Sequence, residues 1–405
     1  MEVEFVDFNV LVGANAAGKS NLIDALRFLR DVERHGLPNA VSMQGGVEYL
    51  RNAEIGASQP LEVKATFKSE DFFARMIPRV GDTYMRILPK EVKLTFSLTF
   101  PKYAPTYGVL KEEVEIPVEF ATMELAGNNR LFHNASEKNS GVLKMHRDGN
   151  KPVVSLVYDD EFGGGAVPGF SDFMFMERVN KTEVIWRQFM RFFLPYRSFA
   201  NISIFDFDPK LPKQSVQITG RQELEEDGSN LALVLQNILR SRQQKRLLTN
   251  IVRDLLPFVE KFSVQSVADR SVYFSLHDSY GKSHSGIPAA FMSDGTINVL
   301  AIVCAAFFDE SSTIVIEEPE RNLHPVLISK IVALLRDAAT SKQVLLTTHS
   351  PEIIKHSGLD SLLFVTRGKD GFTRISRPAD SESIKAFLED EIGVDDLFTQ
   401  NLLGL

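Results

Sequence analysis

Residues 9–26, NVLVGANAAGKSNLIDAL, decide the fold. Residues 8–12, FNVLV, are apolar and β-branched, which is typical of a short buried strand. From residue 20 onward, an apolar side chain returns at helical spacing, at Leu22, Leu26, Leu29 and Val32. The segment between strand and helix follows the pattern GxxxxGK[ST]. The sequence therefore predicts a phosphate-binding loop that joins a strand to a helix.

This loop supplies the residue types that a nucleotide needs. Two glycines allow backbone amides to wrap the phosphates, Lys19 reaches the terminal phosphates, and the Ser20 hydroxyl is offered to Mg²⁺. A chance glycine-rich turn is the alternative, but the strand, the spacing and the helix agree. We assign nucleotide contacts to Gly13, Asn15, Gly18, Lys19, Ser20 and Asn21.

Paired acids follow a second apolar strand in SSTIVIEEPERNLHP, residues 311–325. Adjacent carboxylates at the end of a buried strand are costly unless a metal or a charged ligand is present. We assign Glu317 to Mg²⁺, mostly through water, and Glu318 to polarising the attacking water. A solvated acidic turn is the alternative interpretation.

Two further segments complete the set. In QVLLTTHSPEII, residues 343–354, His349 follows an apolar strand, and we assign it to the γ-phosphate; a satisfied polar residue at a strand end is the alternative. In AAFMSDGTINVLAIVCAAFF, residues 289–308, Ser293 can cap an apolar helix whose first amides could hold an anion. A capped core helix is the alternative there.

Composition sets limits on the partners. The 405 residues include 45 basic and 53 acidic ones, and the net charge of -8 disfavours a nucleic-acid binder that uses its whole surface. The single cysteine, Cys304, excludes an intrachain disulfide and is expected to be a core thiol. An acidic N-terminus and the lack of any apolar stretch near about 20 residues predict a soluble, cytoplasmic protein with no membrane partner.

The middle of the chain alternates between strand-like and helical patterns. Strand-like runs between residues 61 and 160 predict an antiparallel β lobe. Residues 181–196 predict an amphipathic helix, with Trp186 in the core rather than stacked on bases. Residues 228–262 predict two helices, and residues 263–285 a hairpin. A basic cluster between the two helices predicts either DNA contact or a solvated face, and consists of Arg240, Arg242, Lys245 and Arg246.

Taken together, GANAAGKSN, MSDGT, VIEEPERNLHP and TTHSP resemble the Walker A, signature, Walker B with D-loop, and switch-histidine motifs of ABC-class ATPases. The chain is most similar to the RecF and OLD-like branch of AAA-family ATPases, the AAA_21 type. The resemblance implies an α/β P-loop fold, with a mixed sheet core and helices, an antiparallel β lobe and a helical insertion. The domains expected are residues 1–170, 171–285 and 286–405. Only 56 residues follow His349, so we expect a closing acidic helix at 381–398 and no TOPRIM nuclease domain.

The same resemblance implies an ATPase that converts ATP and water to ADP and phosphate, with ATP and Mg²⁺ as cofactors. In such enzymes the signature of one subunit caps the ATP held by another, which predicts an ATP-driven homodimer. Ser293 and Gly295 would then touch the γ-phosphate in trans, and Asn322 would line the dimer contact. Gln44 is either a metal ligand of the Q-loop kind or part of a surface turn.

At two positions the sequence departs from the family pattern, and both carry an acidic residue. Glu317 stands where the family usually has aspartate, which adds a methylene to its reach toward the metal. Asp294 stands where transporters have glycine, which places a carboxylate near phosphate and puts the strength of trans capping in question.

Three functions are consistent with these motifs. The first is an ATP-hydrolysing switch that acts on DNA or on an effector protein, in genome maintenance or anti-phage defence. The second is a slow-turnover sensor or scaffold for a separately encoded nuclease or toxin. The third, the ATP subunit of a transporter, is disfavoured because the signature and the β lobe do not match.

Overall fold

The computed structural model describes residues 1–50, 59–68, 74–78, 83–101, 106–126, 131–134, 139–149, 151–158, 183–187, 190, 198–220, 223–267, 270–280 and 286–380. The chain forms two compact units. The first unit comprises Met1–Arg27 and Asn201–Leu405, and the second comprises Phe28–Ala200. The predicted acidic helix at 381–398 lies outside the described residues.

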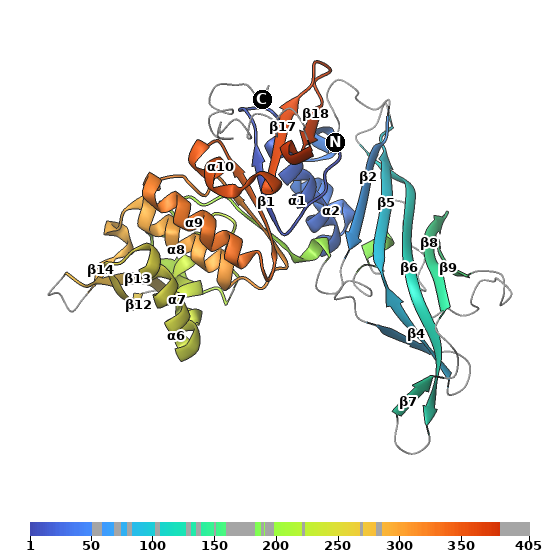
Figure 1. Cartoon of the computed structure of the whole chain (residues 1–405), viewed down its shortest axis with the longest axis horizontal. Coiled ribbons are helices and arrows are strands. Elements are labelled where there is room, and N and C mark those ends of the chain that lie inside the picture. Colours follow the sequence, from blue (N-terminus) through green and yellow to red (C-terminus); the bar gives the residue numbers. More distant parts are fainter. Residues whose placement is uncertain are drawn as a thin grey trace. The chain divides into compact units, whose positions relative to one another are not determined.

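A six-stranded mixed sheet is the centre of the first unit (Figure 1). Five strands are parallel, and the sixth runs antiparallel at one edge. In spatial order they are β10 (Ile202–Phe205), β15 (Thr313–Glu317), β16 (Gln343–Thr348), β1 (Phe8–Val12), β17 (Leu362–Arg367) and β18 (Thr373–Ser376). This arrangement confirms the predicted mixed α/β core and the three strands predicted beside the motifs.

The register of this sheet brings the motifs to one edge. Ile316 lies opposite both Phe205 and Leu346, and Val12 lies opposite Thr348. Since parallel strands end at the same edge, the segments that follow β10, β15, β16 and β1 meet there. Ligands of open α/β sheets bind at this carboxyl edge.

Helices cover one face of the sheet in the first unit. The inward side chains of the parallel strands share one apolar core with α6 (Leu231–Arg240), α7 (Arg242–Leu255), α8 (Asp294–Phe307) and α9 (Pro325–Ala338). Helix α8 is apolar on all sides, and every residue from Ile297 to Ala306 is buried. Cys304 is one of these residues, and burial raises the pKa of its thiol, so the predicted core thiol is confirmed. Helix α10 (Pro351–Ser357) packs beside α9.

A smaller antiparallel sheet completes the first unit. It contains the predicted hairpin, although its first strand begins earlier than expected, at Val259. Its strands are β11 (Val216–Gln217), β12 (Val259–Val267), β13 (Ser271–Asp278) and β14 (Ile287–Pro288). The first unit also contains the short 3-10 turns η4 (Ala289–Phe291), η5 (Leu359–Ser361) and η6 (Pro378–Asp380), whereas η3 (Phe199–Asn201) spans the border between the two units.

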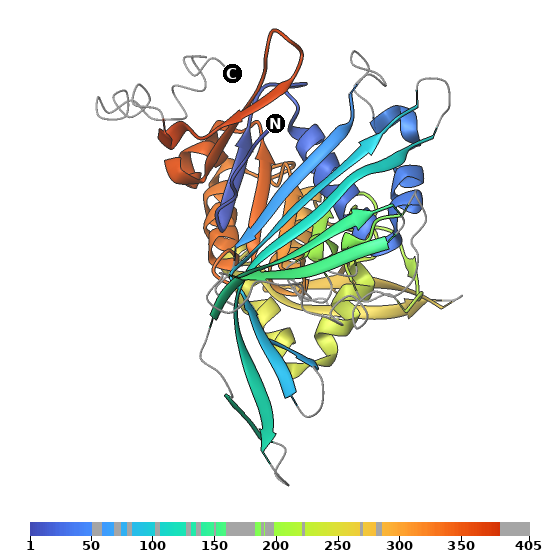
Figure 2. The same ribbon diagram turned by 90° about the vertical axis from the view of Figure 1, so that its right-hand side faces the viewer.

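The second unit is built around an antiparallel sheet, as predicted (Figure 2). Helix α1 (Lys19–His35) runs from the first unit into the second, which also contains α2 (Leu37–Met43) and α3 (Val47–Leu50). The longest strand, β6, pairs with four others. The strands are β2 (Leu61–Lys68), β3 (Arg75–Pro78), β4 (Thr83–Pro89), β5 (Glu91–Thr99), β6 (Gly108–Ala126), β7 (Leu131–Asn134), β8 (Asn139–Asp148) and β9 (Lys151–Tyr158).

A buried ion pair and an aromatic cluster anchor this sheet. Trp186 is fully buried and lies 6.0 Å from Phe96 and 6.1 Å from Phe199 between ring centres, which confirms its predicted core position. The Glu112 carboxylate accepts hydrogen bonds from the backbone N–H groups of Ile185 and Trp186 and pairs with Arg147. Much of the predicted helix at 181–196 lies outside the described residues.

The unit borders differ from the three domains predicted from the sequence. The predicted borders after residues 170 and 285 do not coincide with a unit border. Helices α6 and α7 and the hairpin share the core of α8 and α9, so residues 201–285 of the predicted insertion belong to the first unit, whereas residues 171–200 belong to the second. Within the described residues, no helix is long and apolar enough to cross a membrane.

Candidate functional site

The loop between β1 and α1 requires its two motif glycines for packing as well as for ligand access. A Cβ atom on Gly13 would lie 2.3 Å from the backbone oxygen of Val365. Gly18 has a φ of 109°, and a Cβ there would lie 2.0 Å from the Thr373 hydroxyl. A side chain at Gly13 would clash with the backbone, and one at Gly18 would meet both a clash and a strained backbone, so both positions require glycine. The β17–β18 hairpin therefore closes against this loop.

Lys19 is folded back into the loop that it follows. Its ammonium donates to the carbonyls of Gly13 at 2.8 Å and Ala14 at 3.2 Å. Burial lowers the pKa of Lys19, while the charges of Glu318 and Glu320 raise it. The lysine is therefore within electrostatic reach of the acids that follow β15.

Three other predicted nucleotide contacts are exposed to solvent. Asn15, Ser20 and Asn21 are exposed, and Ser20 lies in the first turn of α1. The Asn21 amide donates to the Thr373 hydroxyl at 3.4 Å. The start of α1 thus presents free amides and one hydroxyl, as an anion site at a helix N-terminus requires.

The acid pair at the end of β15 consists of Glu317, the last residue of the strand, and Glu318, whose backbone conformation is unusual. Glu318 has a φ of 43°, a strain of about 1 to 3 kcal/mol for a residue with a Cβ. Its N–H donates to the carbonyl of Thr347 at 3.0 Å, which ties it to the end of β16. Burial raises the pKa of Glu317, nearby Asp206 raises it further, and Arg27, 3.9 Å away, lowers it.

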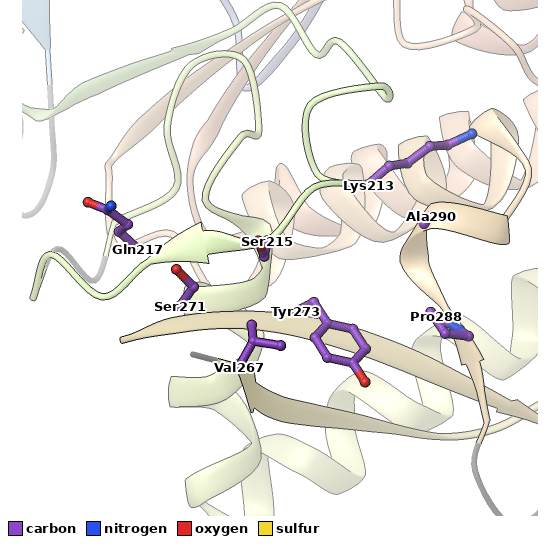
Figure 3. A pocket seen from close by; sticks show the side chains of 8 residues that line it. All are labelled: Lys213, Ser215, Gln217, Val267, Ser271, Tyr273, Pro288 and Ala290. Atoms are coloured by element: carbon purple, nitrogen blue, oxygen red, sulfur yellow. The ribbon is translucent and has the colours of Figure 1, made fainter. Parts of the chain in front are cut away.

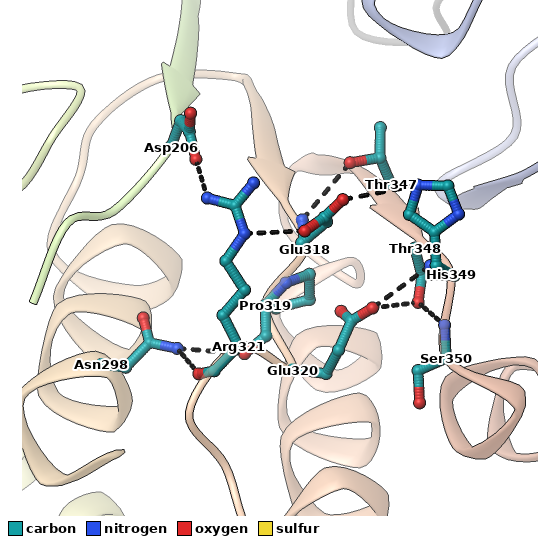
Figure 4. Close-up of polar contacts among 10 residues, drawn as sticks. All are labelled: Asp206, Asn298, Glu318, Pro319, Glu320, Arg321, Thr347, Thr348, His349 and Ser350. Atoms are coloured by element: carbon teal, nitrogen blue, oxygen red, sulfur yellow. Dashed lines mark hydrogen bonds and ion pairs between the residues drawn. The ribbon is translucent and has the colours of Figure 1, made fainter. Parts of the chain in front are cut away.

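An arginine and a histidine surround the Glu318 carboxylate (Figure 4). Arg321 Nε donates to Glu318 Oε2 at 2.7 Å, and Arg321 Nη1 donates to Asp206 Oδ1 at 2.5 Å. His349 Nε2 lies 3.5 Å from Glu318 Oε1. Burial and the Lys19 charge lower the pKa of His349, so the imidazole is neutral at neutral pH. Glu318 and His349, which the sequence analysis assigned to separate tasks, therefore lie side by side.

Glu320 is a site residue that the sequence reasoning missed. Its carboxylate accepts from the Thr348 hydroxyl at 2.5 Å and from the backbone N–H of His349 at 3.3 Å, and burial raises its pKa. It therefore holds the strand end that carries the histidine. Its position one residue after Pro319, in a run of three glutamates, was the available signal.

Asp206 was missed as well. It directly follows β10, in register beside the end of β15, where it interacts with Glu317 and Arg321. The signal was an apolar strand that ends in an acid, ISIFD, which resembles the pattern at Glu317.

Hydroxyl and carboxylate oxygens are ligands that Mg²⁺ accepts, and Mg²⁺ usually keeps several waters. The hydroxyl of Ser20 and the carboxylate of Glu317 are therefore groups of the kind that fit such an ion.

The signature segment behaves as a helix cap. Ser293 Oγ accepts from the backbone N–H of Thr296 at 3.2 Å, which confirms the predicted capping of α8. Asp294, the departure from the family pattern, pairs with Lys213 at 2.5 Å. This lysine supplies a positive charge that compensates the extra carboxylate.

Helix α8 is in direct contact with the segment after β15. A Cβ on Gly295 would lie 2.6 Å from the carbonyl oxygen of Asn322. The buried amide of Asn298 donates to the carbonyls of Pro319 at 3.2 Å and Arg321 at 2.7 Å. The start of α8 and the acid-bearing segment are therefore coupled by close packing and hydrogen bonds.

Gln44 belongs to the second unit. It ends α2, and its backbone N–H donates to the carbonyl of Ala40 at 3.1 Å. Its role as a metal ligand stays a prediction.

An open groove of about 570 Å³ lies on the smaller sheet of the first unit (Figure 3). Lys213, the partner of Asp294, is one of its lining residues. The others are Ser215, Gln217, Val267, Ser271, Tyr273, Pro288 and Ala290, and none of these is a residue of the motifs above.

The sheet order, the glycine loop between β1 and α1 and the acid-bearing strand are those of a P-loop ATPase fold. The chain belongs to the family described as "AAA domain, putative AbiEii toxin, Type IV TA system", whose model matches residues 8–77 and 167–355, more than half of the chain. A search of curated proteins found no match to the chain.

Solved structures of SMC heads are similar to the chain at low identity. One is the SMC head bound to the C-winged helix domain of ScpA, at 14% identity and a TM-score of 0.41, covering 92% of this chain and 91% of that one. The SMC head domain from Thermotoga maritima has 12% identity and a TM-score of 0.37, with 93% and 92% covered. The Smc head with an extended coiled coil, from Pyrococcus furiosus, has 12% identity and a TM-score of 0.43, with 96% and 95% covered.

Proposed function

We propose that the chain binds ATP with Mg²⁺ and hydrolyses it to ADP and phosphate. The observation that carries this proposal is the convergence of Lys19, Glu318 and His349 at one edge of the sheet. These residues are far apart in the sequence, yet they are within electrostatic reach of one another. Their residue types match the tasks of phosphoryl transfer to water.

Each residue has one task in this proposal. Lys19 exchanges its contacts with the Gly13 and Ala14 carbonyls for phosphate oxygens. Glu318 accepts a hydrogen bond from the attacking water, and neutral His349 donates one to the terminal phosphate. Glu317 and Ser20 hold Mg²⁺, which supplies positive charge to the phosphates when it is bound.

We further propose that ATP assembles two copies of the chain. The capped start of α8 offers free amides and the Ser293 hydroxyl, and the phosphate-binding loop of a second copy offers the anion that it would hold. The ion pair between Lys213 and Asp294 supports this assignment, because the lysine compensates the negative charge of the aspartate. Gly295 and Asn322 lie together beside this surface.

The mass in solution tests this assembly. The Glu318→Gln protein is expected to change from monomer to dimer when Mg-ATP is added, because nucleotide bound without turnover keeps the sandwich closed. Adding Ser293→Arg should abolish the change, since the larger side chain fills the space that phosphate needs. Light scattering with and without Mg-ATP measures both. A mass that stays constant in both proteins would refute trans capping.

The partner of this switch is DNA or an effector protein, and charge distribution favours testing DNA first. In the second unit, several lysines of the sheet each pair with a glutamate at 2.7 to 2.8 Å, among them Lys64, Lys93, Lys111 and Lys144. At the start of α7 the basic cluster is exposed, and no described carboxylate forms an ion pair with Arg240, Arg242, Lys245 or Arg246. Unpaired cations at a helix start suit a phosphate backbone.

Neutralising this cluster is expected to weaken duplex DNA binding by about tenfold or more and to lower its salt dependence. The test variant replaces Arg242, Lys245 and Arg246 by glutamine, and the control replaces Lys64, Lys93 and Lys111 by glutamine. Both lose the same charge, so fluorescence anisotropy with labelled DNA separates a local surface from net charge. Equal weakening in both, or no binding by the natural chain, would favour a protein effector.

The slow-turnover scaffold is the second candidate function. The family description supports it because that description names a toxin. In that case ATP binding alone would assemble a complex with a separately encoded nuclease or toxin. Genome maintenance and anti-phage defence stay proposals for the biological role.

A further inference from the structure

One oxygen of the Glu318 carboxylate is bound by Arg321, and the other faces His349. Oε2 accepts from Arg321 Nε at 2.7 Å, and Oε1 faces His349 Nε2 at 3.5 Å. Figure 4 shows the Arg321 guanidinium between Glu318 and Asp206. A carboxylate that activates water needs an oxygen directed at that water. The ion pair with Arg321 therefore competes with the task proposed for Glu318.

The arginine is fixed from two directions. Its side chain is held by Asp206, which follows β10, and its carbonyl oxygen accepts from the Asn298 amide of α8 at 2.7 Å. The adjacent Asn322 has a φ of 61° and packs against Gly295 in the first turn of α8. The start of α8 is thus in direct contact with the backbone of Arg321 and Asn322.

We propose that Arg321 is a positioning residue that restrains Glu318 until helix α8 is engaged at its N-terminal end. This inference rests on the proposed ATP hydrolysis and adds its regulation. Ligand binding at Ser293 and Gly295 moves the backbone of Arg321 through Asn298 and Asn322, and the guanidinium releases Glu318 while it keeps its pair with Asp206. Hydrolysis is thereby coupled to assembly.

The pairs involved are weak enough to be released. The side chains of Arg321 and Asp206 are 43% and 51% exposed, and that of Glu318 is 29% exposed. Partly exposed ion pairs of this kind contribute little, so removing Arg321 is expected to raise the basal rate only about three- to tenfold.

Steady-state hydrolysis at low protein concentration tests the inference. Arg321→Gln is expected to raise kcat about three- to tenfold and to leave KM unchanged, since the arginine acts on Glu318 and not on ATP. Arg321→Lys should restore the low rate at least in part, because it keeps the charge beside Glu318. The double variant Arg321→Gln with Glu318→Gln should lose the gained activity. Arg253→Gln is the matched control, because Arg253 is an exposed arginine that, among the residues the structure describes, bonds only to the backbone carbonyls of Val259 and Glu260.

The outcomes separate this inference from the function on which it rests. If the natural chain hydrolyses ATP and Arg321→Gln is equal or slower, the restraint is refuted and the ATPase stands. If KM rises in step with kcat, Arg321 acts on nucleotide binding, which also overturns the inference. If neither protein binds a fluorescent ATP analogue nor hydrolyses ATP, the proposed function itself fails.

Discussion

Lys19→Ala should reduce ATP hydrolysis by about 100- to 1000-fold, the loss typical of removing one preorganised donor to a developing negative charge. Affinity for ATP should fall as well, because the ammonium is the only basic side chain that the loop itself carries. The side chain is 9% exposed and already directed into the loop by the carbonyls of Gly13 and Ala14. Little reorganisation is needed before it can bind phosphate.

The measurement pairs steady-state hydrolysis with equilibrium binding of a fluorescent ATP analogue. Lys261→Ala is the control, because Lys261 is an exposed lysine on β12 in the same unit. Circular dichroism of both variants establishes that they are folded. Full activity in a folded Lys19→Ala protein would mean that the loop is a structural turn.

The strands and helices beside the motifs could be predicted because their signals are local. An apolar run followed by a glycine loop or by acids predicts both the strand and its end, as at β1 and β15. The cap of α8 is equally local, since Ser293 and the Thr296 amide are three residues apart. Local patterns therefore predicted the segments that follow β1, β15 and β16, although Glu320 within one of them was missed.

Contacts that depend on strand order could not be predicted in this way. Asp206 is near Glu317 only because β10 pairs with β15, and β10 comes more than a hundred residues earlier in the chain. The pair of Lys213 and Asp294 likewise joins distant segments. The role of the helices near 231–255 was obscured because their core partners, α8 and α9, come later in the sequence.

Glu318→Gln should lower kcat by a factor on the order of 10² to 10⁴, the usual contribution of a general base, while ATP affinity changes little. The glutamine amide keeps the size of the side chain, and its oxygen can still accept from Arg321 Nε. What disappears is the charge that would draw a proton from water. Hydrolysis and nucleotide binding are therefore expected to separate in this variant.

Glu310→Gln serves as the control, because Glu310 is an exposed glutamate in the same unit, outside the motifs. A fall in hydrolysis equal to that of the control would exclude Glu318 as the base and direct attention to Glu320 and Asp206, the other acids at this edge.

The Glu318→Gln variant also decides between the two proposed roles, the turnover switch and the scaffold. If it keeps its activity in cells although hydrolysis is lost, ATP binding alone is sufficient and the scaffold replaces the turnover switch; if both are lost, the cell requires the energy of the hydrolysis step that Glu318 performs.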